Sequence, residues 1–334
     1  MLANVIRSNN NSNNNSTGIV THICTAISKK VHCYIKYKFL VLLFLPAIVS
    51  FLIFNYAPMY GIIIAFKDFK FLKGILNSPW TSHNGFGHFY TMFSGRTFPK
   101  VFLNTIYISS LKLIFGFPAP IILALLLNEL RSIRLKKFIQ TITYMNHFIG
   151  WVILTGILKQ FLSPSIGPIG YIMQELGMQP INFLSDSHWF KAVLVSSSIW
   201  KEVGWGSVVY LATIAGINPE LYEAAITDGA TRLQCAIHIT LPSLSFVIAF
   251  LFTMGLSSII NDDFDQIFNL MQNNPAVLNS ADVISTYTYR QGLKMMEYGY
   301  AAAVGLFKNA IAIIMLLVTD FVLKKSTQGE HGIF

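Results

Sequence analysis

The chain has 334 residues, of which 53% are hydrophobic and 14% aromatic, while only 12% are charged. Soluble domains carry about a quarter charged residues, so this composition excludes a disordered chain and argues against a soluble enzyme. The formal net charge is +9. Most basic residues fall between long apolar stretches rather than on one polar face, which indicates a membrane protein and not a nucleic-acid binder.

Six stretches are apolar over the length of about 20 residues that a membrane-spanning helix needs. They predict an all-α, polytopic fold with spans at roughly 39–66, 101–127, 139–161, 189–217, 243–261 and 299–323. The three cysteines are far apart and show no metal-ligand spacing.

Three segments follow from these spans. Residues 1–36 are basic and contain an Asn-rich run, so we expect a disordered cytoplasmic tail. Residues 37–325 form the predicted transmembrane domain, and 326–334 form a short cytoplasmic tail. Lys and Arg are more frequent in the segments on the N-terminal side of the membrane, and 162–188 on the other side has none. This bias predicts a multi-pass protein of the cell (plasma or inner) membrane with both termini on the cytoplasmic side.

The segment between the fourth and fifth spans predicts a short helix, a turn and another helix. Asn218 suits an N-cap, Pro219 suits the first helical turn, and Gly229 can end the helix. A second helical piece is expected over 231–238. Three- and four-residue spacing places one set on a common face, namely Leu221, Ala224, Ala225 and Asp228.

This segment also carries a family resemblance. The spacing of Glu223-Ala224-Ala225, Gly229, Ile239 and Leu241-Pro242 resembles the EAA loop of ABC importer permeases, and Asp228 matches the form common in sugar importers. The similarity runs from about Tyr37 to the C-terminus. Stretches 54–61 and 112–118 look like the polysaccharide and alginate group, which is related to the maltose permease.

The resemblance implies a type I ABC importer permease fold for oligo- or polysaccharides. Its partners would be a second homologous permease, a cytoplasmic ABC ATPase dimer and an extracellular solute-binding protein. Loop 218–242 would seat a coupling helix on the ATPase, through Glu223, Ala224, Ala225, Asp228, Gly229, Leu241 and Pro242. The chain has no G-x-x-x-x-G-K-[ST] loop. It would therefore be no enzyme and bind no cofactor, with ATP and Mg on the ATPase.

Ionisable residues inside spans are costly and mark candidate functional positions. Lys201 and Glu202 lie near the middle of the fourth span, while Lys112 and Lys308 lie in the second and sixth. Interhelical ion pairs and a substrate pathway both remain open as explanations. An excess of mid-membrane lysines would favour an acidic saccharide.

Counting from the EAA motif in the related maltose permease gives two sets of substrate-contact positions. The span before the loop supplies Ser198, Lys201, Glu202 and Trp205, and the span after it supplies Gly255, Ser258, Ile259 and Asp262. These residue types differ from those of the maltose site, so we expect another sugar. Trp205 is the preferred residue for stacking on a sugar ring.

Two other classes compete with this interpretation. A membrane-embedded lipid-linked saccharide transferase would need a cluster of acidic or His residues at a span end, and Asp262, Asp263 and Asp265 are its only candidates. A secondary transporter would show paired repeats, and none is visible. His83, His88 and His147 are isolated polar residues near span ends, without metal-site spacing.

Overall fold

The computed structural model describes residues 37–272 and 274–326, and the predicted tails 1–36 and 327–334 lie outside them. Regular structure in the described residues is helical, apart from one isolated antiparallel bridge between Lys67 and Trp80. Contacts within the chain separate the residues up to Ile62 from those from Ile63 onward. The all-α prediction is confirmed for the described residues.

The first predicted span is a helical run over Lys38–Phe66. It consists of α2 (Lys38–Phe51), the π-helical turn η1 (Leu52–Tyr56) and the 3-10 segment η2 (Ala57–Phe66). Pro58 has no N–H to give to a preceding carbonyl, so the hydrogen-bond register changes in its neighbourhood.

A connection follows that contains η3 (Phe71–Lys73), α3 (Gly74–Asn77) and α4 (Gly87–Ser94). The next two helices, α5 (Thr97–Gly116) and α6 (Pro118–Glu129), form one span of 33 residues, Thr97–Glu129. Pro118 begins α6, a position at which its missing N–H is tolerated. The second predicted span is therefore confirmed as a helix.

The third predicted span, 139–161, is not one helix. The chain forms α7 (Ile133–Met145), the 3-10 turn η4 (Asn146–Phe148) and α8 (Trp151–Phe161), and the two helical parts meet at 103°. Gly150 has an extended backbone and starts the new helix. A short helix, α9 (Pro168–Glu175), comes next.

The fourth predicted span is α10 (Ser187–Ala215), 29 residues long. Asp186 caps it by accepting hydrogen bonds from the N–H groups of His188 and Trp189. These two donors hold the pKa of the Asp186 carboxyl below its usual value. The helix is not among those apolar enough to span a membrane by composition, and it carries Lys191, Lys201 and Glu202.

The C-terminal part begins with α11 (Pro219–Thr227), α12 (Arg232–Cys235), the π turn η5 (Ala236–Thr240), α13 (Leu241–Ser243) and α14 (Ser245–Ser257). The fifth predicted span, 243–261, contains α14 as one helix, and at its N-terminal edge Arg232–Ser243 and Ser245–Ser257 meet at 62°. The remaining helices are α15 (Phe264–Met271), α16 (Pro275–Ala281), α17 (Ile284–Tyr289), the π turn η6 (Arg290–Lys294) and α18 (Tyr298–Ser326).

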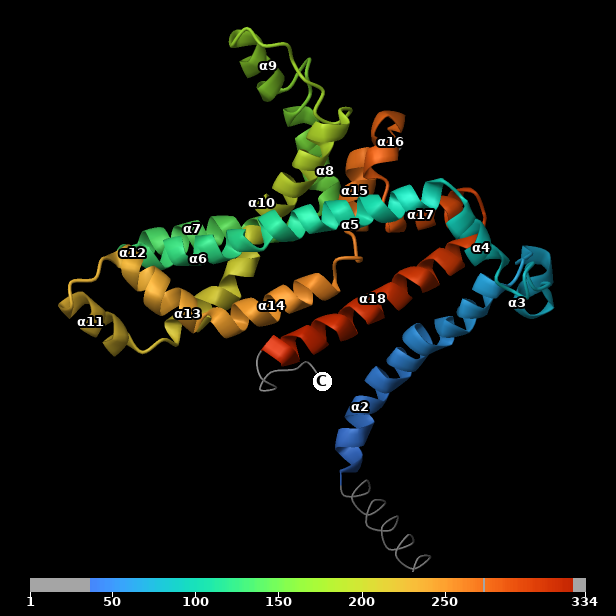
Figure 1. The fold of residues 1–334 in the computed structure, drawn as a ribbon, viewed down its shortest axis with the longest axis horizontal. Coiled ribbons are helices and arrows are strands. Elements are labelled where there is room, and N and C mark those ends of the chain that lie inside the picture. The colour runs from blue at the N-terminus through green and yellow to red at the C-terminus, as the bar shows by residue number, and fades with distance from the viewer. Residues whose placement is uncertain (1–36, 273, 327–334) are drawn as a thin grey trace, which may run out of the picture. The chain divides into compact units, whose positions relative to one another are not determined.

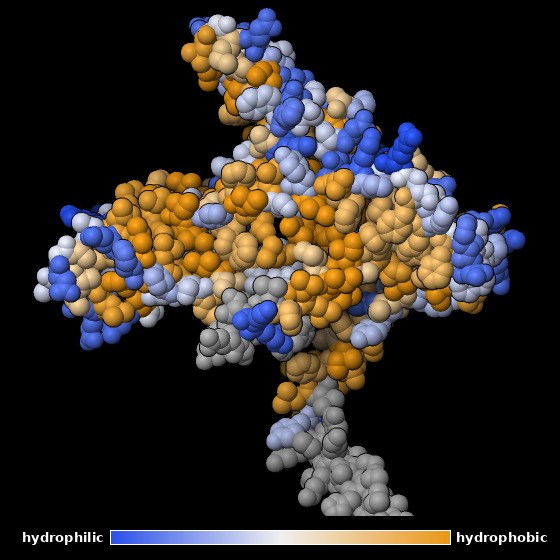
Figure 2. Space-filling model, viewed as in Figure 1, coloured by the Kyte–Doolittle hydropathy of each residue, from blue (hydrophilic) through white to orange (hydrophobic). Residues whose placement is uncertain are grey.

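From Ile63 onward, α5 and α6 together extend from an end that carries α3 and α4 to an end that carries α11 and α12 (Figure 1). Helix α14 runs inward from the end with α11 and α12, and α18 runs inward from the end with α4. Orange apolar residues cover the middle of these helices, and blue polar residues gather at both ends (Figure 2). Among the described residues, three helices are long and apolar enough to cross a membrane, or five if each bent pair is one span. The distribution fits a multi-pass membrane protein.

Helix α10 packs against α5, α6 and α7. Gly204 makes the approach to α7 possible, because a Cβ at this position would overlap the backbone of Thr143. Phe190 and Leu194 of α10 are fully buried with Ile108 of α5 and Ile267 of α15. Helix α10 is thus the element around which the neighbouring helices are arranged.

We predict that Gly204→Ala destabilises the protein by about 1–3 kcal/mol or more, because the two backbones must move apart. Gly156→Ala in α8 is the matched control, since a Cβ there meets nothing within 4 Å. The control should be neutral or slightly stabilising. Thermal unfolding in detergent measures both, and equal midpoints would contradict the close-approach argument.

Candidate functional site

Helix α11 is a short, solvent-exposed helix with strong caps at both ends. The Asn218 side chain accepts a hydrogen bond of 3.1 Å from the Glu220 N–H, and Pro219 occupies the first turn. No residue of the helix is buried, and Leu221 and Ile226 are 51% and 64% exposed. The predicted N-terminus is confirmed. The helix therefore leaves two large apolar side chains uncovered by the rest of the chain.

The C-terminus of α11 closes on Gly229, whose φ of +82° favours glycine. The N–H of Gly229 donates to the Ile226 carbonyl, and that of Ala230 donates to the Ala225 carbonyl, which together form a Schellman motif. A hydrogen bond of 2.9 Å between the hydroxyls of Tyr222 and Thr240 joins α11 to η5. Helix α11 is therefore a capped, exposed helix at one end of the bundle, held to η5 by a side-chain hydrogen bond.

The other residues of the predicted EAA loop lie on or next to α11, α12 and α13. Glu223, Ala224 and Asp228 are exposed, Ala225 is half-buried, and Leu241 and Pro242 begin α13. The predicted second helical piece is α12 followed by η5, and Thr231 caps it with a capping box to Gln234.

A second polar region lies at the break between α7 and α8. The Lys201 side chain is 9% exposed, and its ammonium donates a hydrogen bond to the carbonyl of His147, which the end of α7 leaves without a helical partner. The same ammonium lies 5.7 Å from the centre of the Trp151 ring. The Lys201 ammonium therefore satisfies a carbonyl at the break between the two helices and also contacts an aromatic face.

Glu202 meets the same turn from the adjacent position on α10. Its carboxylate lies 2.8 Å from Nδ1 of His147 and 3.8 Å from the Lys201 ammonium. The His147 ring stacks on Trp205, with 4.7 Å between ring centres and 8° between planes. We call these residues, His147, Trp151, Lys201, Glu202 and Trp205, the α7–α8 cluster.

The exposed members of this cluster face away from the helices of this chain. The Glu202 side chain is 46% exposed, and Trp205 is 49% exposed. A carboxylate facing hydrocarbon would be costly. This edge of α10 therefore faces water, a substrate or another protein. Such a combination of carboxylate, imidazole and indole can hydrogen-bond and stack on a sugar.

The four residues predicted to contact substrate after the coupling loop differ in exposure and in their partners. The Asp262 side chain is 1% exposed, lies 3.3 Å from the Lys308 ammonium and accepts a hydrogen bond from the Ser285 N–H. Gly255 packs against Leu113, Ser258 is exposed with its hydroxyl bonded to the Gly255 carbonyl, and Ile259 is half-buried. In this structure Asp262 acts as a structural ion partner.

Lys112 also has a structural partner, because its ammonium donates to the side-chain carbonyl of Gln266. The amide of Gln266 donates in turn to the Leu194 carbonyl and the Ser197 hydroxyl of α10. The mid-membrane lysines thus each have an acceptor, and Glu202 and Asp262 lie against two of them. Gln266 is neutral, so the three lysines still outnumber the two carboxylates beside them, and selection of an acidic saccharide by these lysines stays a prediction.

Sequence reasoning did not assign His147, Trp151 or Gln266 to a site. His147 is separated from Glu202 by 55 positions, and Gln266 from Lys112 by 154. The one available signal was Gly150, which follows the polar pair Asn146-His147 inside an apolar stretch. Ser198 lies near the cluster on α10 and is half-buried. Among the described residues no three His, Cys, Asp or Glu side chains converge as a metal site requires.

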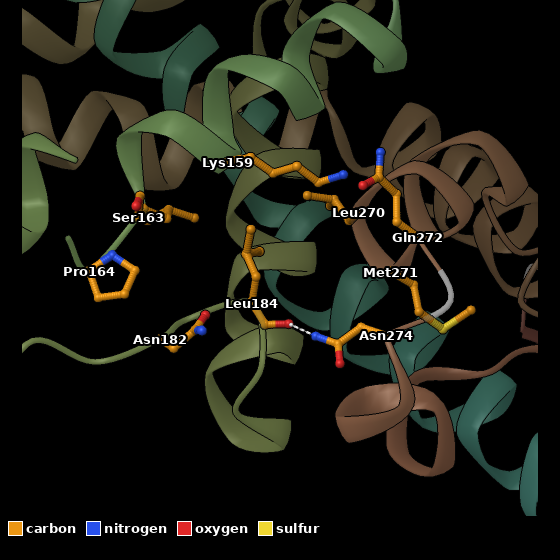
Figure 3. Close-up of a pocket in the computed structure, with 10 residues that line it drawn as sticks. Lys159, Ser163, Pro164, Asn182, Leu184, Leu270, Met271, Gln272 and Asn274 are labelled. Carbon is orange, nitrogen blue, oxygen red and sulfur yellow. Dashed lines mark hydrogen bonds between the residues drawn. The ribbon is translucent and has the colours of Figure 1, made fainter. Parts of the chain in front are cut away.

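A cavity of about 360 Å³ lies between the end of α8, segment 182–184 and α15 (Figure 3). The Lys159 side chain points toward Leu270 and Gln272, and its ammonium donates to the Asn269 carbonyl. The Asn274 amide closes one side by donating to the Leu184 carbonyl. The lining mixes amides, hydroxyls and leucines, from Lys159, Leu162, Ser163, Pro164, Asn182, Leu184, Leu270, Met271, Gln272 and Asn274.

Comparison with known proteins decides the family. Residues 116–328 match the family described as binding-protein-dependent transport system inner membrane component. The chain belongs to this family. It is thus a multi-pass membrane permease, and the predicted resemblance to the permeases of binding-protein-dependent importers is confirmed at the level of the family.

Curated relatives and solved structures are similar over nearly the whole permease. Protein LplB of Bacillus subtilis (strain 168) is 41% identical over 297 residues, covering 89% of this chain and 91% of that protein. The polygalacturonan/rhamnogalacturonan transport system permease protein YteP of the same organism is 39% identical over 300 residues, covering 90% and 91%.

Two solved structures share the fold. A chain of a bacterial ABC transporter involved in the import of the acidic polysaccharide alginate has a TM-score of 0.80 and 41% identity, covering 87% of the permease and 97% of that chain. A chain of a bacterial alginate ABC transporter in complex with an alginate pentasaccharide-bound periplasmic protein has a TM-score of 0.80 and 40% identity, covering 90% and 98%. These findings give no support to the lipid-linked saccharide transferase.

We predict that Lys201→Ala lowers the stability of the permease by about 1–3 kcal/mol, because it leaves the His147 carbonyl unpaired and Glu202 without its neighbouring cation. Lys100→Ala is the control, since Lys100 is exposed in the first turn of α5. Thermal unfolding in detergent should show a lower midpoint for the first variant alone. Equal midpoints would mean that Lys201 does not hold the turn.

Proposed function

We propose that the permease forms half of the translocation pathway of an ATP-driven importer for oligo- or polysaccharides that carry carboxylates. The observation that carries this is α11, an exposed and doubly capped helix at one end of the bundle, in a chain 41% identical to a chain of an alginate importer. The substrate class follows from the relatives that import alginate and polygalacturonan.

The proposed topology has six spans with both termini in the cytoplasm. Three helices and two bent pairs supply five spans, and α10 supplies the sixth. Its low hydropathy is reasonable because Lys201 is bonded to protein and Glu202 faces the pathway side. The basic residues at the α11 end agree with a cytoplasmic location.

The proposed coupling site is loop 218–242. Glu223 supplies a carboxylate to the ATPase, Ala224 and Ala225 keep the helix surface flat for close packing, and Asp228 and Gly229 make the turn. Leu241 and Pro242 begin the return into the membrane at α13. ATP and Mg would be bound by the two ATPase subunits, so the hydrolytic chemistry lies outside this chain.

The proposed pathway passes the exposed edge of the α7–α8 cluster. Trp205 offers an indole face to a sugar ring, and Glu202 and His147 offer hydrogen-bonding groups to hydroxyls. Ser198 lies on α10 and Gly255 on α14, the helices before and after the coupling loop, and Ser258 and Ile259 follow the end of α14. Lys201 and Asp262 would position these elements, because both are engaged with protein groups.

The geometry also suggests how the two sites communicate. Helix α10 carries the cluster, ends at Ala215, and is followed after three residues by α11. When the ATPase subunits close and move α11, the motion would pass along α10 to the α7–α8 turn. Alternating access would then change the exposure of Glu202 and Trp205 to the two sides of the membrane.

We predict that Glu223→Lys abolishes most sugar-dependent ATP hydrolysis in the reconstituted complex, because it reverses a charge at the proposed ATPase contact. Glu175→Lys makes the same change on exposed α9, at a distance in sequence from the loop. Co-purification of the ATPase and ATP hydrolysis measure the effect. Unchanged association and hydrolysis in Glu223→Lys would refute the coupling role.

We predict that Trp205→Ala raises the sugar concentration for half-maximal transport about fivefold, since an aromatic stacking contact contributes roughly 1 kcal/mol. Trp200→Ala is the control, because Trp200 is similarly exposed at 46% but lies on another face of α10. Uptake into vesicles that enclose ATP, with the binding protein on the outside, measures both. An equal effect of the two variants would remove Trp205 from the pathway.

A further inference from the structure

An apolar cavity of about 450 Å³ lies beside the coupling loop, between α6 and the α12–η5–α13 segment. Ile122, Leu125 and Leu126 line it from α6, and Leu233, Ile237 and Leu241 line it from the other side. Ile122 and Leu126 are 55% and 62% exposed. In a membrane protein such a groove faces hydrocarbon unless a subunit covers it, and its lining suits an acyl chain.

One end of this cavity is charged. Arg232 lies there, with its guanidinium 3.6 Å from the Glu129 carboxylate and 3.4 Å from the Glu129 carbonyl. The Arg232 side chain is 59% exposed, so it retains donors for another anion. Ile122 lies seven residues before Glu129 on the same helix, about 10 Å deeper. The Arg232 cation at one end and the apolar lining deeper in the cavity therefore match the charged headgroup and the acyl chain of a lipid.

The adjoining start of α7 adds an unbalanced positive charge. Arg131, Arg134, Lys136 and Lys137 lie within two turns of its N-terminus, and its first turn holds no acidic residue. Between Asp68 and Glu175 the sequence has one acidic residue, Glu129, and Arg232 already engages it. The positive end of a helix repels cations. This arrangement costs free energy unless an anion lies against it.

We propose that the cavity and these basic residues form a binding site for an anionic phospholipid. The acyl chain lies along Leu126 and Ile122, and the phosphate lies between Arg232 and the start of α7. Basic clusters beside membrane helices favour anionic headgroups for this electrostatic reason. The lipid would touch η5 and α13, the segment that leads from the coupling loop into the membrane, and would fix that segment during transport.

The test uses the complete importer complex in nanodiscs of phosphatidylcholine with a minor fraction of phosphatidylglycerol, without ATP or sugar. Phosphatidylglycerol retained by the complex is counted by native mass spectrometry. Arg131→Gln/Arg134→Gln should bind it about thirtyfold more weakly, since each basic residue near the surface contributes roughly a factor of five. Arg96→Gln/Lys100→Gln removes the same charge at the start of α5 and should leave retention unchanged.

A second pair of variants tests the acyl-chain position. Leu126→Trp fills the cavity and should lower retention, whereas Leu103→Trp, at a similarly exposed position of 64%, should not. Equal retention of phosphatidylcholine and phosphatidylglycerol by the unmodified complex would overturn the proposal. Loss of ATPase co-purification without loss of lipid in Arg131→Gln/Arg134→Gln would also overturn it, because the cations would then contact protein. The readout does not depend on transport, so it stands apart from the proposed import function.

Discussion

A helix that ends inside a membrane leaves carbonyl groups that hydrocarbon cannot solvate. The most consequential contact in this permease supplies a hydrogen-bond donor to one such carbonyl. The Lys201 ammonium bonds the His147 carbonyl at the break between α7 and α8. Because the turn is held there, His147 reaches Glu202 and stacks on Trp205. The sharp bend and the candidate pathway edge meet at this contact, and the missing Cβ of Gly204 lets α10 approach α7 next to it.

Helix α10 connects that arrangement to the coupling end. Its C-terminus lies three residues from α11, which carries its own caps and is joined to η5 through Tyr222 and Thr240. A helix that is capped at both ends and makes few contacts with the rest of the chain can move as a unit when a partner protein binds it. The long α10 then provides a rigid link between the proposed ATPase contact and the α7–α8 cluster.

Most ionisable groups at membrane depth have structural partners in this fold. Lys308 is paired with Asp262, and Lys112 is bonded to Gln266, which also ties α15 to α10. Burying such groups is affordable only where a partner compensates the desolvation. Glu202 differs because nearly half of its side chain is exposed, and this exposure makes it the most informative charged residue for substrate recognition.

The sequence by itself determined the features that depend on local chemistry. Apolar stretches identified the helices of the first, second and sixth spans, and Asn218, Pro219 and Gly229 located α11 with its caps. Tertiary structure decided the break in the third predicted span, the role of His147 and the partner of each lysine. Glu202 lies 55 positions from His147, and Lys308 lies 46 from Asp262. Pairings over such separations depend on how the helices pack, which no local pattern of residues specifies.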